Sequence, residues 1–519
     1  MRLSYFQCCI AALLLSAMAT AQPAIPDTAM MQKIRAAEKQ YSQLAVIAHQ
    51  LTDVCGPRLT NSAGYKRAIS YVSKTFKEWG LVNAGPEAWG SFGLGWNNQR
   101  TYLAMQQPYY QPMIGYPQAW TKGTTHPLSA QVILLNKFDS ASIDQLGDAI
   151  KGKIVIRKAR KTSLATPFEP AEGRYADTAL NNLPDADIVT RNEVREYAAA
   201  VKHDYYTKLY LEAKGAVGLL NSSTDSRDGT VFSNGGPAYV KQYKPSLPEM
   251  AITREDHLKL ERLLADKINV QLEMDVQNAF TDDTIGYNVV GEIPGTDPQL
   301  KNEVVMLGGH LDSWHTATGA TDNAAGCAVM LEVMHLFKQM GIQPRRTIRI
   351  ALWGGEEQGP YGSIGYVKKH FADPATMRLL PEHKKISAYF NLDNGSGKIR
   401  GIYLQNNDQL RSLFSAWLAP FADLGATGIT SSNTASTDHI SFDAVGIPAF
   451  QFIQDPLEYE SRTHHSNMDN YDHLSLDDMQ QAVVIVAAFV YNTAMRNELL
   501  PRKPLPKPER YIYEADFPW

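Results

Sequence analysis

The chain has few cysteines, no apolar run long enough for a membrane span and no cluster of basic residues. Its 519 residues include 4 cysteines, too few for the disulfide framework that stabilises small secreted domains. The formal net charge of -4 comes from 50 basic and 54 acidic residues that are intermixed along the chain. Because nucleic-acid-binding proteins concentrate lysine and arginine in patches, nucleic acid is not an expected partner. Nor is a stable membrane span expected.

The first 21 residues have the pattern of a secretory signal peptide. Arg2 supplies the positive start, residues 10–15 the short apolar core, and Ala19-Thr20-Ala21 the small residues of a cleavage site. The alternative is a buried N-terminal helix. We therefore expect a secreted or periplasmic protein. Cys55 and Cys327 would remain after cleavage, and the position of Cys327 on the apolar face of a predicted helix favours a buried free thiol.

The length and the 44% hydrophobic content allow more than one core, and two folded domains are expected. Residues 22–118 and 281–500 are predicted to form one domain in two parts. Residues 119–280, in which short β-type runs alternate with polar loops, are predicted to form a β-rich insert between them. One of these loops is a long, Tyr-rich section near residues 168–206. Residues 501–519 contain several prolines and are expected to be an irregular tail.

Strands and helices alternate after residue 283, which is typical of an α/β fold. Apolar segments predict strands at residues 303–309, 347–353, 386–392 and 448–453. Apolar residues at helical spacing and capping residues predict helices at residues 28–53, 62–79, 323–340 and 475–495. Ser475 and Asp478 are expected to cap the last of these helices.

Residues that can bind metal ions follow directly after three of the predicted strands. The candidates are His310, Asp312, Asp322, Glu356, Glu357, Asp393 and His465. His310, the pair Glu356-Glu357 and Asp393 each stand at the carboxyl end of a strand, where the loops of an open α/β sheet converge on a ligand. Imidazole and carboxylate groups can hold two cations that share one water, and a spare carboxylate can move its protons. The spacing therefore predicts a dinuclear hydrolase site.

Each candidate also has an ordinary structural explanation. His310 is compatible with a capped surface imidazole, Asp322 with a helix N-cap, and Glu356-Glu357 with a solvated acidic turn. The apolar strand that leads into the glutamate pair argues against an exposed turn. At Asp393, which follows a buried strand, an unpaired carboxylate would be costly. Taken together, the residues favour the metal site over separate explanations.

The adjacent glutamates point in different directions and can have different functions. One can bind metal while the other stays free near the shared water as a general base, which works best when burial raises its pKa. Asp312 is better placed to orient the imidazole of His310 than to bind metal itself.

These motifs resemble those of the M28 family of zinc metallopeptidases. The resemblance rests on the segments GGHLDSWHTATGATDNAAGCAVMLE, LWGGEEQGPYGS, NLDNGSG and HHSNMDNYD, and on the N-terminal LTDVCGPRLTNSAGYKRA. It covers residues 283–498 well and implies an α/β, three-layer zinc-exopeptidase domain (phosphorylase/hydrolase-like) with a central mixed sheet. The segment IKGKIV at residues 150–155 resembles a protease-associated (PA) domain, which is inserted in several members, including carboxypeptidase Q-like proteins.

The resemblance implies a function for each residue of the site. The implied zinc ligands are His310 and Asp393 for one ion, Glu357 and His465 for the other, and Asp322 as the bridge between two Zn²⁺ ions. Glu356 would be the general base. The family also implies a cis peptide bond between Asp322 and Asn323.

His464 departs from the family pattern. Many members have tyrosine at this position, where its hydroxyl stabilises the oxyanion, and an imidazole can donate the same hydrogen bond. His464 is also an alternative to His465 as the metal ligand, although the spacing of His465 to Asp469 favours His465. The triplet Thr437-Asp438-His439 resembles the family's Ser-Asp-His, and we expect it to shape the substrate pocket.

The expected function is that of a secreted dinuclear zinc exopeptidase that acts on short peptides or dipeptides. The sequence does not distinguish an aminopeptidase from a carboxypeptidase or dipeptidase. One alternative is a glutaminyl cyclase-like acyltransferase, which usually has one zinc and lacks the PA insert. The other is a receptor-like binding protein, a class that loses metal ligands. The insert and the complete ligand set favour the peptidase, and association into a homodimer is left open.

Overall fold

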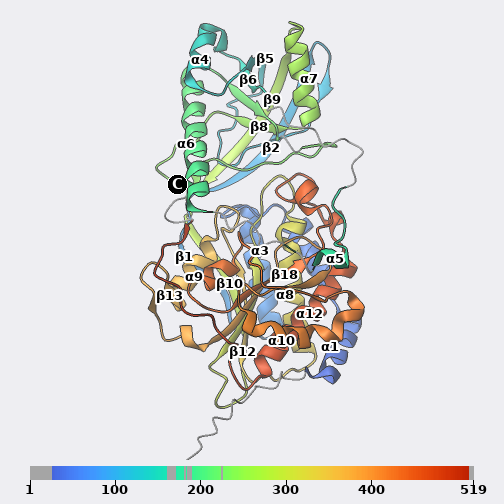
Figure 1. The fold of residues 1–519 in the computed structure, drawn as a ribbon. Helices are drawn as coiled ribbons and strands as arrows, with labels where there is room; N and C mark the ends of the chain where they lie inside the picture. The colour runs from blue at the N-terminus through green and yellow to red at the C-terminus, as the bar shows by residue number, and fades with distance from the viewer. Residues whose placement is uncertain (1–25, 160–170, 181–182, 184–189, 224–225, 513–519) are drawn as a thin grey trace, which may run out of the picture.

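The computed structural model describes residues 26–159, 171–180, 183, 190–223 and 226–512. The signal peptide expected at residues 1–21 lies outside the described residues. Two eight-stranded sheets belong to two domains, one above the other in Figure 1. None of the helices among the described residues is both long and apolar enough to cross a membrane.

The lower domain, called here the α/β domain, contains a mixed sheet with the strand order β1-β10-β12-β11-β15-β18-β16-β17. Its strands are β1 (Val82–Ser91), β10 (Ile285–Ile293), β11 (Val304–His310), β12 (Thr347–Trp353), β15 (Ile386–Asn391), β16 (Ile399–Tyr403), β17 (Gly428–Thr430) and β18 (Ala449–Gln454). The central strands β12, β11, β15 and β18 are parallel to one another. All four strands expected from the apolar segments are confirmed to within one residue at each end.

Helices cover both faces of this sheet. They are α1 (Thr28–Tyr41), α2 (Leu44–His49), α3 (Ala63–Glu78), α8 (Ala325–Gln339), α9 (Tyr361–His370), α10 (Arg411–Leu418), α11 (His439–Asp443) and α12 (Leu476–Met495), with a small hairpin of β13 (Ala372–Asp373) and β14 (Arg378–Leu379). Side chains alternate along β11, so Val305 and Leu307 join the core formed with α8 and α12. Val304 and Met306 join the core on the opposite face.

Two helix predictions need correction. The helix expected at residues 28–53 is interrupted, because α1 ends at Tyr41 and α2 begins at Leu44. Ser42 accounts for the break, since its side chain bonds to Glu38 and accepts a hydrogen bond from the Leu44 backbone. The capping pair expected for α12 is also wrong. Ser475 makes no side-chain cap, and Asp478 instead forms an ion pair with Arg174.

The upper domain contains the second sheet, with the strand order β3-β2-β9-β5-β6-β7-β8-β4. Its strands are β2 (Gly95–Gln107), β3 (Gln111–Pro112), β4 (Gly115–Pro117), β5 (Leu128–Leu135), β6 (Ile154–Arg157), β7 (Gly218–Asn221), β8 (Glu249–Ile252) and β9 (Gln271–Thr281). We call residues 95–281 the inserted domain. The expected boundary at residue 119 falls inside this sheet, because β2 pairs along its length with β9.

The inserted domain contains more helix than its polar sequence suggested. Its helices are α4 (Ser140–Leu146), α5 (Asp177–Leu180), α6 (Arg191–Ala213) and α7 (Arg254–Ala265). The Tyr-rich section expected as a loop near residues 168–206 contributes much of α6, which begins with a capping box formed by Thr190 and Glu193. Only 5 residues of this helix are buried, and its apolar residues do not repeat at a clear helical spacing.

Both cysteines of the described chain are free and buried, which confirms the expectation for Cys327.

A fully buried arginine, Arg58, fixes the loop that follows β11. Its guanidinium donates hydrogen bonds to the carbonyl oxygens of Leu51, Leu311, Thr318 and Gly319. Arg58 therefore holds the backbone on both sides of the loop that leads to Asp322.

Replacing Arg58 with methionine tests this function. Because Arg58→Met leaves four carbonyl groups without their donors, three of them in buried contacts, we expect the free energy of unfolding to fall by about 3–5 kcal/mol. Urea denaturation followed by circular dichroism measures the change. The exposed Arg378 provides the control, since Arg378→Met should change the stability by less than about 0.5 kcal/mol. Equal stabilities for the two variants would contradict the proposed function of Arg58.

Candidate metal centre

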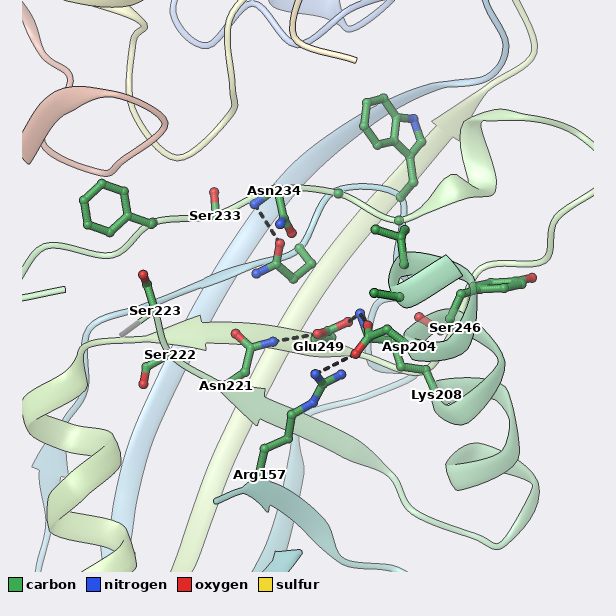
Figure 2. A pocket seen from close by; sticks show the side chains of 18 of the residues that line it. Arg157, Asp204, Lys208, Asn221, Ser222, Ser223, Ser233, Asn234, Ser246 and Glu249 are labelled. Carbon is green, nitrogen blue, oxygen red and sulfur yellow. Dashed lines mark hydrogen bonds and ion pairs between the residues drawn. The ribbon is translucent and has the colours of Figure 1, made fainter. Parts of the chain in front are cut away.

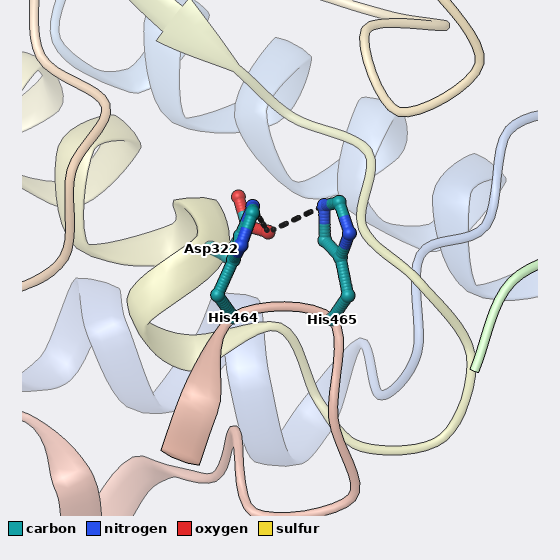
Figure 3. A group of neighbouring side chains, drawn as sticks. All are labelled: Asp322, His464 and His465. Atoms are coloured by element: carbon teal, nitrogen blue, oxygen red, sulfur yellow. Dashed lines mark ion pairs between the residues drawn. The ribbon is translucent and has the colours of Figure 1, made fainter. Parts of the chain in front are cut away.

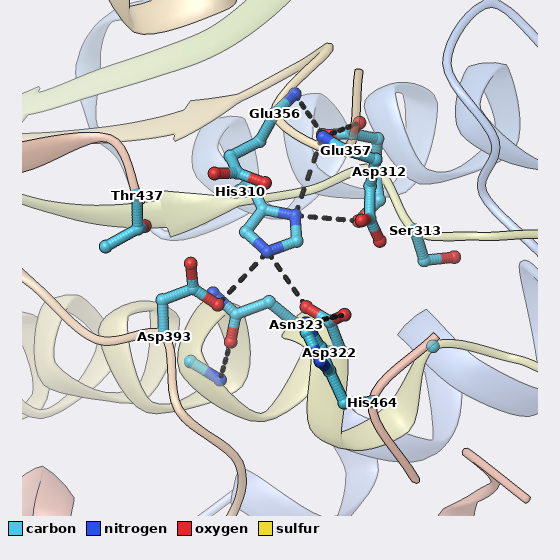
Figure 4. A network of polar contacts seen from close by, with 12 residues as sticks. His310, Asp312, Ser313, Asp322, Asn323, Glu356, Glu357, Asp393, Thr437 and His464 are labelled. Atoms are coloured by element: carbon cyan, nitrogen blue, oxygen red, sulfur yellow. Dashed lines mark hydrogen bonds and ion pairs between the residues drawn. The ribbon is translucent and has the colours of Figure 1, made fainter. Parts of the chain in front are cut away.

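The predicted site residues meet at the carboxyl ends of the parallel strands (Figure 4). His310 is the last residue of β11, Glu356 and Glu357 follow β12, and Asp393 follows β15. Parallel neighbouring strands end at the same edge of a sheet, so their loops converge there. The placement expected from the sequence is confirmed.

His310 lies between two carboxylates. Its Nε2 atom is 3.1 Å from Asp322 Oδ1 and 3.1 Å from Asp393 Oδ1. Its Nδ1 atom lies 3.1 Å from the backbone oxygen of Asp312. This second contact fixes the imidazole ring and leaves Nε2 directed between the two carboxylates.

Asp312 holds the imidazole of His310 as expected, but mainly through its backbone oxygen. Its carboxylate is 3.7 Å from His310 Nδ1, so the backbone oxygen, not the side chain, makes the closer contact. The carboxylate instead accepts hydrogen bonds from the backbone N–H groups of Glu356, at 3.2 Å, and Glu357, at 3.3 Å. The Thr60 hydroxyl donates to it as well. Asp312 therefore orients the backbone of the glutamate pair.

Asp322 faces the two halves of the site with its two oxygens. Oδ1 faces His310, whereas Oδ2 lies 3.4 Å from Nε2 of His465 (Figure 3). The same His465 nitrogen is 3.0 Å from Glu357 Oε2. Each oxygen of the Asp322 carboxylate thus faces a different histidine, as a carboxylate shared between two cations requires. The Asp322–Asn323 peptide bond is cis, as expected.

The site has unpaired carboxylate oxygens and an excess of acidic groups, which bound cations would balance. Among the described residues, Asp322 Oδ2 and Glu357 Oε2 are buried and accept no hydrogen bond. Burial raises the pKa values of Glu356 and Glu357 well above the usual range, and nearby carboxylates raise them further. Three sets of residues place potential ligand atoms within 4.8 Å of one another: His310, Glu356 and Asp393; His310, Asp322 and Glu357; and Asp322, His464 and His465. Carboxylates thus outnumber the histidines, an imbalance that divalent cations would offset.

The carboxylates of the two adjacent glutamates have different contacts. Glu357 Oε1 accepts a hydrogen bond from the backbone N–H of Trp314 at 3.0 Å, and its other oxygen faces His465. The carboxylate of Glu356 points to the opposite side, toward His310 and Asp393 (Figure 4). Glu357 is therefore held in place, whereas Glu356 lies beside the centre of the site.

His464 is also directed at the site. Its Nδ1 atom is 3.2 Å from Glu460 Oε2, and its Nε2 atom is 3.8 Å from Asp322 Oδ2. Burial lowers the pKa of His464, but the carboxylates of Glu460 and Asp322 outweigh this effect and raise it to about 9. Without bound cations, the imidazole is therefore protonated at neutral pH and can donate a hydrogen bond. Glu460 was not identified from the sequence, which has no motif that marks it.

Asp469 holds the backbone of the bridging residue. Its carboxylate accepts hydrogen bonds from the backbone N–H groups of Thr321 at 2.6 Å and Asp322 at 3.1 Å. Burial raises the pKa of Asp469 to about 7. The sequence suggested only its spacing to His465, and its contact with residues about 150 positions earlier had no visible signal.

The expectation that Thr437-Asp438-His439 shapes the substrate pocket is not supported. Asp438 and His439 are fully buried, and neither lines the large cavity beside the site. Thr437 instead accepts a hydrogen bond from Asn391 on β15, and His439 contacts Gln405. Thr437 therefore contacts the end of β15, and His439 contacts the loop that follows β16.

The inserted domain is bonded directly to the loop that carries His465. The backbone N–H of Ser233 donates to the His465 carbonyl at 3.1 Å. Asn467 donates its backbone N–H to the Val231 carbonyl and accepts the Val231 N–H at its side-chain oxygen, at 2.7 Å. Its side-chain nitrogen donates to the Gly229 carbonyl. His465 has a φ of 56°, in the left-handed region, so these bonds stabilise a costly conformation.

A second part of the inserted domain contacts the beginning of the same loop. The Leu457 backbone N–H donates to the Gly173 carbonyl at 2.9 Å. Arg174 forms ion pairs with Asp455 at 2.9 Å and Asp478 at 2.7 Å. The loop from residue 455 to residue 469 is therefore held on both sides.

Replacement of Asn467 tests the first of these attachments. Asn467→Ala removes two side-chain hydrogen bonds, so local opening should become easier and amide hydrogen exchange in residues 463–469 should rise by roughly tenfold. Mass spectrometry of exchanged peptides measures the effect. The exposed Asn302 provides a matched control, and Asn302→Ala should leave the exchange of that loop unchanged. Unaltered exchange in the Asn467 variant would mean that the inserted domain does not stabilise the loop.

Known proteins are similar to this chain in sequence and in fold. Residues 288–490 match the family described as Peptidase family M28. Carboxypeptidase Q of Bos taurus is 26% identical over 475 residues, which cover 90% of this chain and 88% of that protein.

Two solved structures have the same fold. The structure of a Peptidase M28 precursor from Shewanella amazonensis covers 92% of this chain and 98% of its own, with a TM-score of 0.66 and 22% identity. The structure of BSAP, a zinc aminopeptidase from Bacillus subtilis, covers 88% of this chain and 95% of its own, with a TM-score of 0.53 and 19% identity.

Proposed function

We propose that this chain, which belongs to peptidase family M28, is a dinuclear zinc exopeptidase that hydrolyses short peptides. The observation that carries the proposal is the position of Asp322. One of its oxygens faces His310, which lies beside Asp393, and the other faces His465. The two sets of ligands share one carboxylate, as a two-metal site needs.

The proposed ligands are His310 and Asp393 for one zinc, Glu357 and His465 for the other, and Asp322 for both. Imidazole nitrogen and carboxylate oxygen are suitable zinc ligands. Zinc ions bound there would lower the pKa of a shared water and polarise the carbonyl group of the substrate.

Glu356 is the proposed general base. Its carboxylate lies beside His310 and Asp393, and burial raises its pKa well above the usual range. It takes a proton from the attacking water and returns that proton to the amine nitrogen that leaves. Glu357 is held by the Trp314 backbone and is less able to move between donor and acceptor.

His464 is the proposed donor to the oxyanion. Glu460 contacts Nδ1 and leaves Nε2 directed toward the site. A positioned N–H at the place where negative charge develops stabilises the transition state without reorganisation. This imidazole would replace the tyrosine hydroxyl expected in many family members.

The wider assignments are part of the same proposal. The inserted domain is proposed to be a PA domain and the protein to be exported after removal of residues 1–21. Full-length similarity to Carboxypeptidase Q supports a peptidase over a glutaminyl cyclase-like enzyme. The complete set of ligands argues against a receptor-like binding protein.

The substitution Glu356→Gln tests the mechanism. Glutamine has nearly the same shape but cannot accept the proton, so the hydrolysis rate should fall by a factor of about 10²–10⁴. Zinc content, measured by inductively coupled plasma mass spectrometry, should stay the same. Unchanged hydrolysis of a short peptide by this variant would contradict the assignment of the base.

The number of bound zinc ions tests the shared carboxylate. The zinc-loaded protein should contain two ions per chain, and His465→Ala should reduce the content toward one because it removes a ligand of one ion only. Chelation should abolish hydrolysis, and added zinc should restore it. The exposed His49, which pairs with Asp53, provides the control His49→Ala. One ion per chain in the unmodified protein would contradict a dinuclear site.

A further inference from the structure

A large cavity lies between the metal centre and the inserted domain. Its volume is about 790 Å³, and its lining includes His464 and His465 on one side and residues of β6, α6 and β8 on the other. Cavities of this size accommodate small ligands. The bonds of Ser233 and Asn467 fix the inserted domain against the His465 loop, so the two walls have a defined relative position.

Arg157, at the end of β6, is a cation of the far wall that an ion pair and an aromatic ring hold in place (Figure 2). Its Nη1 atom is 2.6 Å from Asp204 Oδ1, and its guanidinium carbon lies 3.4 Å from the centre of the Phe138 ring. Its Nε and Nη2 atoms are buried and have no hydrogen-bond partner among the described residues. These two atoms form the edge with which a guanidinium binds a carboxylate through two parallel hydrogen bonds.

The acidic residues of this wall are already paired. Lys208 forms ion pairs with Asp204 at 2.7 Å and Glu249 at 2.8 Å. Asn221 also donates to Glu249. Burial opposes ionisation of Asp204, but Lys208 and Arg157 lower its pKa to about 2. The negative charges of Asp204 and Glu249 are therefore balanced by Arg157 and Lys208 within the wall.

Two further lysines leave the wall with an excess of positive charge. Lys158 and Lys244 line the cavity, and both are exposed. Neither forms an ion pair with any residue in the described part of the chain. The inserted domain thus presents four cationic side chains and two carboxylates to the cavity. The Glu460 carboxylate belongs to the opposite wall, where it pairs with His464.

Unpaired hydroxyl groups increase the capacity of the wall to donate hydrogen bonds. The side-chain oxygens of Ser222 and Ser233 are buried and make no hydrogen bond among the described residues. Buried polar groups normally have partners. A ligand with several acceptor oxygens and a negative charge matches these groups and the free edge of Arg157.

We propose that this wall binds a carboxylate of the substrate peptide, with Arg157, Lys158 and Lys244 as the residues that select it. The inference rests on the proposed peptidase function, which places the scissile bond at the metal centre. The carboxylate is either the C-terminus of a short peptide or an acidic side chain. In both cases, the inserted domain determines which peptides bind.

Binding of matched peptides tests the inference. The background is the zinc-loaded Glu356→Gln protein, in which substrates should persist. Isothermal titration calorimetry would compare Ala-Ala-Ala, its C-terminal amide and the amide of Ala-Glu-Ala. At least one peptide with a carboxylate should bind roughly tenfold more tightly than the amide of Ala-Ala-Ala. Tighter binding of Ala-Ala-Ala would show that the wall binds the C-terminus of the peptide. Tighter binding of the amide of Ala-Glu-Ala would show that it binds an acidic side chain.

Charge-removing variants show whether the wall causes the preference. Lys158→Gln with Lys244→Gln should remove most of the preference without affecting folding, because both lysines are exposed. Arg157→Gln should also remove the preference. Arg157→Lys should keep only part of it, since lysine retains the charge but cannot form the bidentate pair of hydrogen bonds. Lys241→Gln, at an exposed position outside the cavity lining, should have no effect. Equal affinity for all three peptides, or a preference that survives in the lysine and arginine variants, would overturn the inference.

The proposed function is tested separately by the unmodified protein. Hydrolysis of Ala-Ala-Ala that disappears in the Glu356→Gln variant supports the peptidase, whatever the binding preference. A protein that hydrolyses peptides but does not prefer a carboxylate would contradict only the selective wall. A protein that neither hydrolyses Ala-Ala-Ala nor prefers a peptide with a carboxylate would contradict the proposed function itself.

Discussion

The structure of the site depends on the electrostatic balance around Asp322. This buried carboxylate faces His310 with one oxygen and His465 with the other, and further carboxylates lie close to both histidines. In a region excluded from water, so many acidic groups cannot all be ionised unless cations or protons neutralise them. The central strands, the buried Arg58 and the carboxylate of Asp469 all hold the backbone that carries this arrangement.

The inserted domain contributes to the site as well as to its surroundings. Its residues 229–233 are bonded to the loop of His465, and Arg174 anchors the beginning of the same loop. The position of one histidine therefore depends on contacts between two domains. The same contacts fix the far wall of the cavity, so the ligands of the metal and the residues that meet the rest of the substrate share one support.

The parts of the fold that follow from local pattern could be predicted from the sequence. The parallel strands are buried on both faces and appear as apolar runs, and ligands such as His310 and Asp393 stand directly at their ends. Helix α6 could not be recognised, because its few buried residues are separated by polar ones. The functions of Asp469 and Arg157 depend on partners that are far away in the sequence or on a cavity formed by folding. No local motif records such contacts.

The most direct test of the central claim is anomalous diffraction from zinc-loaded crystals, measured on both sides of the zinc absorption edge. Two peaks should appear, one on each side of the Asp322 carboxylate, with the first beside His310 and Asp393 and the second beside His465 and Glu357. A single peak, or a second peak bound by His464 in place of His465, would contradict the account.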